Sequence, residues 1–179
     1  MSDTTIHSAV QDPSSWIARF AVRAAVGCTA LDLACGGGRH GRLLLGRGHD
    51  VVFVDRDVSG VADLADDRRV ETVEADLEND APWPLADRRF GLVVVANYLW
   101  RPILPKIVGA VAPGGLLLYE TFAVGNEAHG RPRNPDFLLK DGELLEAVRG
   151  HLSVLAYGQL YTDRPSPRVV QRIAARNTG

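Results

Sequence analysis

A cluster of glycines between two apolar runs is the feature that most constrains how this chain folds. Residues 30–34, "ALDLA", form a short and mostly apolar run, and residues 51–54, "VVFV", form a second one. Gly36, Gly38 and Gly41 lie between them with the spacing G-x-G-x-x-G. A strand, a glycine turn that a ligand can approach closely, and a helix begin many nucleotide-binding α/β proteins. The spacing alone leaves open whether the ligand is a dinucleotide or a nucleoside cofactor.

Apolar runs alternate with helix-like patterns along the rest of the chain. The run "FGLVVVANYL" from Phe90 is continuous, which is typical of a parallel strand covered on both faces. Alternation of strands and helices predicts a doubly wound sheet with right-handed crossovers. Strands are expected at residues 30–34, 51–54, 70–74 and 116–122 and from residue 90, and helices at residues 39–47, 60–66, 101–112 and 140–150.

The last two apolar runs, residues 151–161 and 168–175, have only the turn-rich segment "TDRPSP" between them. Strands joined so closely must be antiparallel. The sequence therefore predicts an α/β fold whose doubly wound sheet of about seven strands is mostly parallel and ends in a C-terminal antiparallel β-hairpin. No linker or repeat divides the chain, so we expect a single domain over residues 1–179, with a short helical cap at 1–27 and the core at 28–179.

Composition and charge argue against several classes of protein. The formal net charge of −2 provides no overall field for nucleic acid, and no basic run with interleaved aromatics is present. Cys28 and Cys35 are too few for a disulfide framework and lack metal-type spacing. The first residues do not resemble a signal peptide, and no stretch is long enough to span a membrane. We expect no metal, no membrane partner and no nucleic-acid partner, and a cytoplasmic location; the oligomeric state is not predicted.

Asp32, four residues before Gly36, favours one kind of ligand over the other. A carboxylate beside the glycine loop would repel the pyrophosphate of a dinucleotide. It would attract a ligand that carries an ammonium and a sulfonium group. Asp55 ends the second strand, where a carboxylate can accept hydrogen bonds from ribose hydroxyls, but a dehydrogenase would use that position in the same way.

The pattern Asp32-x-Ala34-x-Gly36-x-Gly38 resembles the first motif of class I S-adenosylmethionine-dependent methyltransferases. Ala34 stands where the family usually has a glycine. "EADL" after the third strand is similar to the family's adenine site, and "APGGLLLYETF" and the closing hairpin are similar to its later segments, so the resemblance covers residues 28–175. It implies a Rossmann-like fold and S-adenosylmethionine as the cofactor. The cofactor contacts that it implies are Asp32, Ala34, Cys35, Gly36, Gly38, Asp55, Arg56, Asp76, Leu77 and Asn97.

Methyl transfer from a sulfonium is an in-line displacement, so alignment and exclusion of water are the protein's main tasks. No essential catalytic residue is therefore guaranteed. Tyr98, after the fourth strand, is a candidate to position the acceptor, and Glu120, near the end of the fifth, is a candidate to take a proton. The motif N-P-P-Y of amide and nucleic-acid amine methyltransferases is absent, because the chain reads "NYLW".

The segment from Glu120 to Leu139 is long for a connection between a strand and a helix and is rich in Gly, Pro and Asn. We expect it to cover the acceptor, with Arg131 or Arg133 recognising an anionic group. Together with "NYLW" it resembles small bacterial methyltransferases of the tellurite-resistance and thiopurine types, which implies a small-molecule acceptor. Two alternatives remain open: a non-catalytic module that binds S-adenosylmethionine, and an NAD-dependent oxidoreductase.

The segment "PSSWIARFAVRAA", residues 13–25, is expected to form one helix of the cap. Its apolar residues Trp16, Ile17 and Phe20 are spaced so that they share one side of such a helix. We expect that side to pack on the core near the cofactor.

Overall fold

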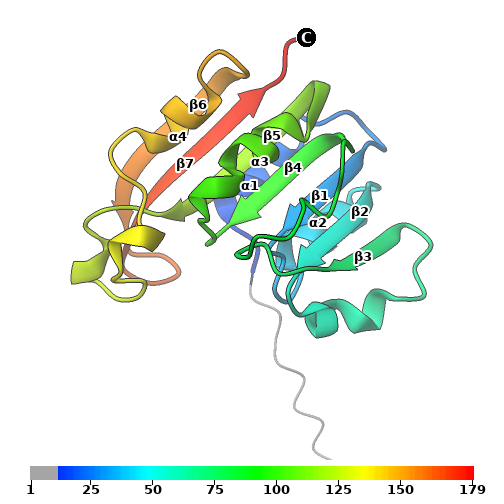
Figure 1. Ribbon diagram of the computed structural model, residues 1–179, viewed down its shortest axis with the longest axis horizontal. Coiled ribbons are helices and arrows are strands. Elements are labelled where there is room, and N and C mark those ends of the chain that lie inside the picture. The colour runs from blue at the N-terminus through cyan, green and yellow to red at the C-terminus, as the bar shows by residue number, and fades with distance from the viewer. Residues whose placement is uncertain (1–11) are drawn as a thin grey trace, which may run out of the picture.

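The computed structural model describes residues 12–179, which form one seven-stranded sheet with helices on both faces (Figure 1). The strand order is β3-β2-β1-β4-β5-β7-β6. Strands β1 to β5 are parallel, and β7 runs antiparallel to both of its neighbours, β5 and β6. The strands are β1 (Thr29–Leu33), β2 (Asp50–Asp55), β3 (Val70–Glu74), β4 (Phe90–Ala96), β5 (Val111–Phe122), β6 (Ser153–Thr162) and β7 (Arg168–Arg176). The predicted fold class, with its C-terminal hairpin, is confirmed.

The helices are shorter than the sequence patterns indicated. The predicted end of the helix at 101–112 is wrong, because Val111 already belongs to β5 and pairs with Phe90. The helix expected at 13–25 is α1 (Ser15–Ala21), and residues 1–11 of the predicted cap lie outside the described residues. The other helices are α2 (Arg39–Gly46), α3 (Leu104–Gly109) and α4 (Glu143–Val148), with 3₁₀ turns η1 (Val58–Leu64), η2 (Arg101–Ile103), η3 (Asn126–Ala128) and η4 (Pro135–Phe137).

Alternate residues of each central strand face two separate hydrophobic cores, because successive side chains of a strand point to opposite faces. Leu31 and Val93 contribute to the core under α3 and α4. Ala30 and Val94 contribute to the core under α1 and α2, which also contains the cap residues Trp16, Ile17 and Phe20, buried as expected. Both faces of β1 and β4 are therefore dry, which is the reason for their continuous apolar sequences.

The glycine loop between β1 and α2 depends on glycine at specific positions. Gly36 and Gly38 have φ angles of 51° and 71°, and Ala34 adopts the same left-handed region with φ 54°. Gly41 has an ordinary backbone, but a Cβ at this position would overlap the ring of Phe53 on β2. The third glycine of the motif therefore allows α2 to pack closely on the sheet.

We expect Gly41→Ala to lower the free energy of unfolding by about 1–3 kcal/mol, because the added methyl group must displace the Phe53 ring. Gly46→Ala is the matched control at the other end of α2, where a Cβ meets no atom within 4 Å. The control should be neutral or slightly stabilising. Urea unfolding of both variants measures the difference, and equal stabilities would contradict this account of the packing.

Candidate functional site

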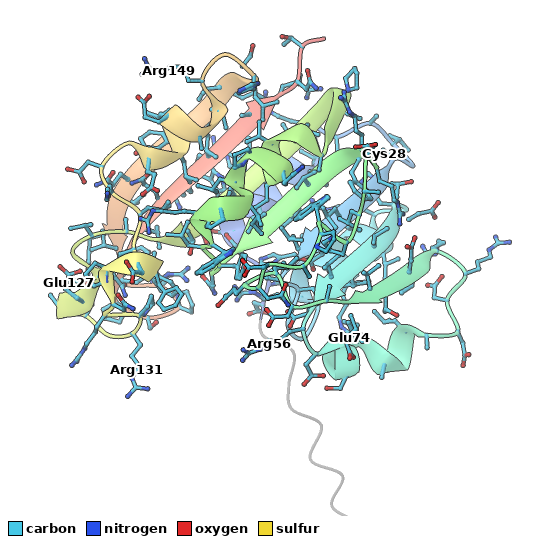
Figure 2. The ribbon with its side chains drawn as sticks, viewed as in Figure 1. Cys28, Arg56, Glu74, Glu127, Arg131 and Arg149 are labelled. Carbon is cyan, nitrogen blue, oxygen red and sulfur yellow. The ribbon has the colours of Figure 1, made fainter. Side chains whose placement is uncertain are left out.

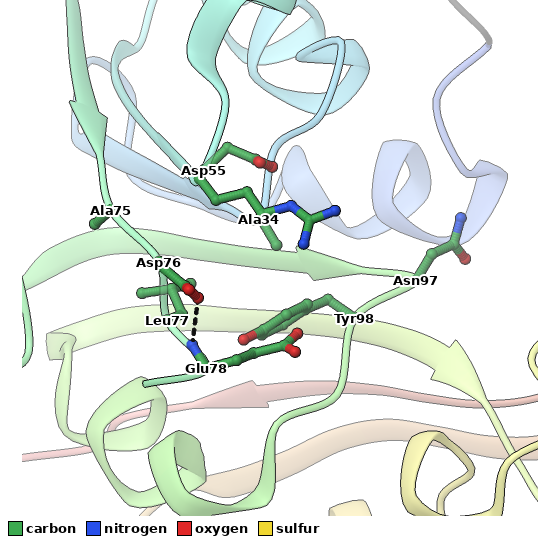
Figure 3. Close-up of a pocket in the computed structure, with 9 residues that line it drawn as sticks. Ala34, Asp55, Ala75, Asp76, Leu77, Glu78, Asn97 and Tyr98 are labelled. Atoms are coloured by element: carbon green, nitrogen blue, oxygen red, sulfur yellow. Dashed lines mark hydrogen bonds between the residues drawn. The ribbon is translucent and has the colours of Figure 1, made fainter. Parts of the chain in front are cut away.

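The carboxyl ends of β1, β2, β3 and β4 meet around one cleft of about 300 Å³, which we call the strand-end cleft (Figure 3). A ligand site at this edge is the rule for open α/β sheets, because loops from neighbouring parallel strands converge there. The lining residues follow directly on the four strands: Ala34, Asp55, Arg56, Ala75, Asp76, Leu77, Glu78, Asn97 and Tyr98. Seven of these residues were predicted from the sequence, and Ala75 and Glu78 were not.

Asp55 joins the second strand to the glycine loop. Its Oδ2 accepts a hydrogen bond from the Gly36 N–H at 2.8 Å, and its Oδ1 accepts one from the Asp57 N–H at 3.2 Å. Each carboxylate oxygen can accept a further bond, so Asp55 can hold the loop and still receive donors from a ligand in the cleft.

Asp32 lies behind the loop rather than in the strand-end cleft. It is buried, and its Oδ2 accepts a hydrogen bond from the Gly41 N–H at 2.7 Å in the first turn of α2. Burial raises the pKa of Asp32 to about 7, and the Gly41 hydrogen bond and the charge of Arg39 only partly oppose this shift. Cys35 is also buried, and desolvation by burial raises the pKa of its thiol to about 12, so it has little thiolate character.

The strand-end cleft carries an excess of negative charge, although not from Asp32. Among residues 12–179, Asp55, Asp76 and Glu78 line it, and Arg56 is the one cation in its wall. Asp76 Oδ1 accepts a hydrogen bond from the Glu78 N–H at 2.9 Å (Figure 3). A cationic ligand suits such a cleft, and a pyrophosphate does not.

Tyr98 lines the end of the cleft and has a hydroxyl that is buried without a hydrogen-bond partner. Burial raises the pKa of Tyr98, and the nearby carboxylates of Glu78 and Asp76 raise it further. Tyr98 therefore stays protonated and can donate a hydrogen bond. A buried polar group without a partner is costly, which makes this hydroxyl a candidate ligand contact.

Two further hollows adjoin the cleft. The first, of about 530 Å³, we call the arginine hollow; it shares Asn97 with the cleft. Its lining residues are Asp12, Arg39, Asn97, Phe122, Asn126, His129, Gly130, Arg131, Pro165, Ser166, Pro167 and Arg168. A smaller hollow of about 230 Å³ shares Asn97, Tyr98 and Glu78 with the cleft and is closed by Phe137 and Pro132.

The long segment after β5 forms walls of both hollows, beside the turn between β6 and β7 (Figure 1). Asn126 fixes it there, because its Oδ1 accepts a hydrogen bond from the Val169 N–H at 3.2 Å. The ring centres of His129 and Tyr161 are 5.0 Å apart across the same junction. The segment is therefore held against the β6–β7 hairpin, where it walls the two hollows.

The other residues predicted to bind the substrate or to take part in catalysis do not line the strand-end cleft. Arg131 borders the arginine hollow, although its side chain extends away from the body of the protein (Figure 2), and Arg133 lines none of the hollows described here. Glu120 is buried inside β5 between Arg168 and Arg172, at N–O distances of 3.7 and 3.9 Å, and lines none of them either. Sequence reasoning missed Arg168, because only the strand pairing brings β7 beside β5.

The sequence matches one family of known proteins. Residues 30–115 match the model of a family described as a methyltransferase domain. This range begins in β1 and includes all of the strand-end cleft. A search of curated proteins finds no match.

Several solved structures have the same fold. TehB from Haemophilus influenzae is 22% identical with a TM-score of 0.66, and the match covers 89% of this chain but only 61% of TehB. A TehB-like methyltransferase from Corynebacterium glutamicum is 22% identical with a TM-score of 0.63, covering 90% and 86% of the two chains. A Burkholderia thailandensis 1,6-didemethyltoxoflavin-N1-methyltransferase, solved with 1,6-didemethyltoxoflavin and S-adenosylhomocysteine, is 19% identical with a TM-score of 0.66, covering 91% and 75%.

The family match and the fold agree with each other. Residues 30–115 match a methyltransferase domain, and the solved structures that share the fold include S-adenosylmethionine-dependent methyltransferases. Two of these structures, TehB and a TehB-like methyltransferase, share the fold of this chain, in agreement with the resemblance to the tellurite-resistance type. Over residues 12–179, no helix has the length and apolarity needed to cross a bilayer, and no three His, Cys, Asp or Glu side chains are grouped to hold a metal ion.

We expect the stability of the protein to contain a pH-dependent contribution from Asp32. Its pKa is about 4 in an unfolded chain and about 7 in the fold, so the contribution is complete below pH ~4 and is lost as the pH rises to ~7. Asp32→Asn keeps an acceptor for the Gly41 N–H and removes the ionisation. The variant's free energy of unfolding, relative to the unchanged protein, should therefore rise from pH 4 to 7 and then level off. Parallel curves in urea titrations across this range would rule out the expected shift.

Proposed function

We propose that the chain transfers a methyl group from S-adenosylmethionine, held in the strand-end cleft, to a small-molecule acceptor held in the adjoining hollows. The observation that carries the proposal is the cleft itself. It joins the glycine loop to three carboxylates, Asp55, Asp76 and Glu78, at the carboxyl ends of four parallel strands. A second support is that the 530 Å³ and 230 Å³ hollows both meet the cleft at Asn97.

The residues present fit the cofactor. Asp55 can accept hydrogen bonds from the ribose hydroxyls, and the Asp76 carboxylate can accept one from the adenine amine, with Leu77 beside the ring. Ala34 and the positive-φ glycines allow the ligand to approach the backbone closely. Asp32 supports these contacts indirectly, because its carboxylate accepts the hydrogen bond from the Gly41 N–H and so fixes the start of α2.

Bound S-adenosylmethionine supplies a methyl group on a sulfonium; a lone pair of the acceptor forms the new bond to carbon, and the electrons of the broken bond remain on sulfur. The chain's own residues align the two partners and exclude water. Tyr98 is placed between the cleft and the small hollow, where its protonated hydroxyl can position the acceptor by donating a hydrogen bond. Glu120 is better explained as a counter-ion of Arg168 and Arg172 than as a base.

A small acceptor agrees with the size of the hollows and with the segment that walls them. The Burkholderia neighbour is a 1,6-didemethyltoxoflavin-N1-methyltransferase, solved with 1,6-didemethyltoxoflavin bound. The experiment is transfer of a labelled methyl group from S-adenosylmethionine into a small-molecule extract of the source cells. Label in products below about 1 kDa supports the proposal. Binding of the cofactor without any transfer would instead favour a non-catalytic binding module.

We expect Asp55→Asn to weaken the binding of S-adenosylhomocysteine about tenfold to hundredfold, the usual cost of losing charge-assisted hydrogen bonds. The asparagine can still accept from the Gly36 N–H, so the loop should keep its conformation. Isothermal calorimetry measures the affinity, with Asp66→Asn, an exposed carboxylate outside the cleft, as the control. An unchanged affinity in Asp55→Asn would place the ribose elsewhere.

Tyr98→Phe separates a ligand contact from simple packing. The lost hydroxyl is buried without a partner, so the variant should be at least as stable as the unchanged protein in thermal unfolding. Labelled methyl transfer should nevertheless fall about tenfold, the cost of one hydrogen bond to the ligand. Unchanged transfer at unchanged stability would show that Tyr98 only packs.

A further inference from the structure

The arginine hollow differs in charge from the strand-end cleft beside it. Arg39, Arg131 and Arg168 line it, and among the described residues the only carboxylate in its wall is Asp12, which is exposed. The strand-end cleft has three carboxylates against one arginine. Two adjoining compartments of opposite sign are suited to two ligands of opposite charge.

Arg168 is the central cation of the hollow. Its side chain is only 12% exposed, and its Nε is buried with no hydrogen-bond partner. Among the described residues its ionic contact is with Glu120 at 3.7 Å, beyond ordinary hydrogen-bond length. A buried guanidinium nitrogen without a partner is costly, and an anion close to the guanidinium lowers that cost.

Glu120 cannot neutralise all the charge around it. The same carboxylate faces Arg172 at 3.9 Å, so one buried anion is shared by two partly buried guanidinium groups. Burial lowers the pKa of Arg39, the charge of Arg168 lowers it further, and the charges of Glu120 and Asp32 raise it, so Arg39 lies near the same groups. Glu120 is thus shared by Arg168 and Arg172, and Arg168 also lines the hollow, where it can meet a second negative charge.

The remaining walls of the hollow are suited to an organic molecule. Phe122, Pro165 and Pro167 provide apolar surface, and the volume of about 530 Å³ is far more than a single oxyanion fills. Asn97 belongs to both compartments, so an acceptor anchored at Arg168 can extend along the apolar walls toward the cofactor.

We infer that the acceptor is a small organic acid, held in the arginine hollow by a carboxylate or phosphate oxygen on Arg168. The inference rests on the proposed methyl transfer and specifies its substrate class. A different atom of the same molecule presents its lone pair near Asn97 and receives the methyl group; the electrons of the methyl–sulfur bond remain on sulfur, and a proton on the accepting atom, if there is one, goes to water.

The test separates the small-molecule extract by anion exchange into an anionic fraction and a neutral or cationic one, and offers each to the protein with labelled S-adenosylmethionine. Labelled product from the anionic fraction is expected. Treatment of that fraction with phosphatase before the assay distinguishes the two sources, because only a phosphate ester loses its acceptor activity. Product from the neutral or cationic fraction alone overturns the inference while leaving the methyl transfer standing. Product from neither fraction overturns both.

Variants then locate the anion. Arg168→Gln should raise the half-saturating concentration of the anionic fraction about tenfold to hundredfold, with the affinity for S-adenosylhomocysteine unchanged. Arg172→Gln is the matched control, because Arg172 also faces Glu120 but does not line the hollow. Arg168→Lys keeps the charge and should lie between Arg168→Gln and the unchanged protein. Equal effects of Arg168→Gln and Arg172→Gln would show a structural role for the pair and overturn the assignment.

Discussion

Two carboxylates hold the glycine loop, and the rest of the site depends on them. Asp32, on β1, accepts from the Gly41 N–H, and Asp55, at the end of β2, accepts from the Gly36 N–H. The Gly41 N–H, in the first turn of α2, has no partner within the helix, and the Gly36 N–H lies in the loop before it, so each carboxylate satisfies a donor that no helical carbonyl reaches. The loop is thereby fixed to two adjacent parallel strands, and the space in front of it becomes the strand-end cleft.

Charge divides this edge of the sheet into two parts. Carboxylates follow β2 and β3, whereas arginines come from the start of α2, the long segment after β5 and the start of β7. The parts meet at Asn97, directly after the central strand β4. A cationic methyl donor and an anionic acceptor would each be attracted to its own part, which aligns them before any side chain takes part in the chemistry.

Much of the site could be predicted because it follows strands that the sequence marks clearly. Several lining residues lie at or just after the end of an apolar strand sequence, and parallel strands bring such positions together. These residues are Ala34, Asp55, Asp76 and Asn97. Asp32 shows the limit of this reasoning. Its position was predicted, but its side chain points behind the loop, and the negative charge of the cleft comes from other carboxylates. The position of a residue along a strand does not by itself tell which face of the sheet its side chain lies on; the pairing with the neighbouring strands is also needed.

By itself the sequence determined the order of elements, the glycine loop and the antiparallel hairpin, since these depend on local patterns: apolar runs, residues that tolerate positive φ, and a connector too short for a crossover. Only the tertiary structure decided the environment of Glu120 and Arg168, which are 48 residues apart in sequence. The pairing of β5 with β7 places them together, and the buried position of Glu120 makes it a counter-ion. Long-range pairing sets such contacts, because burial and neighbouring charge are properties of the assembled sheet rather than of any segment.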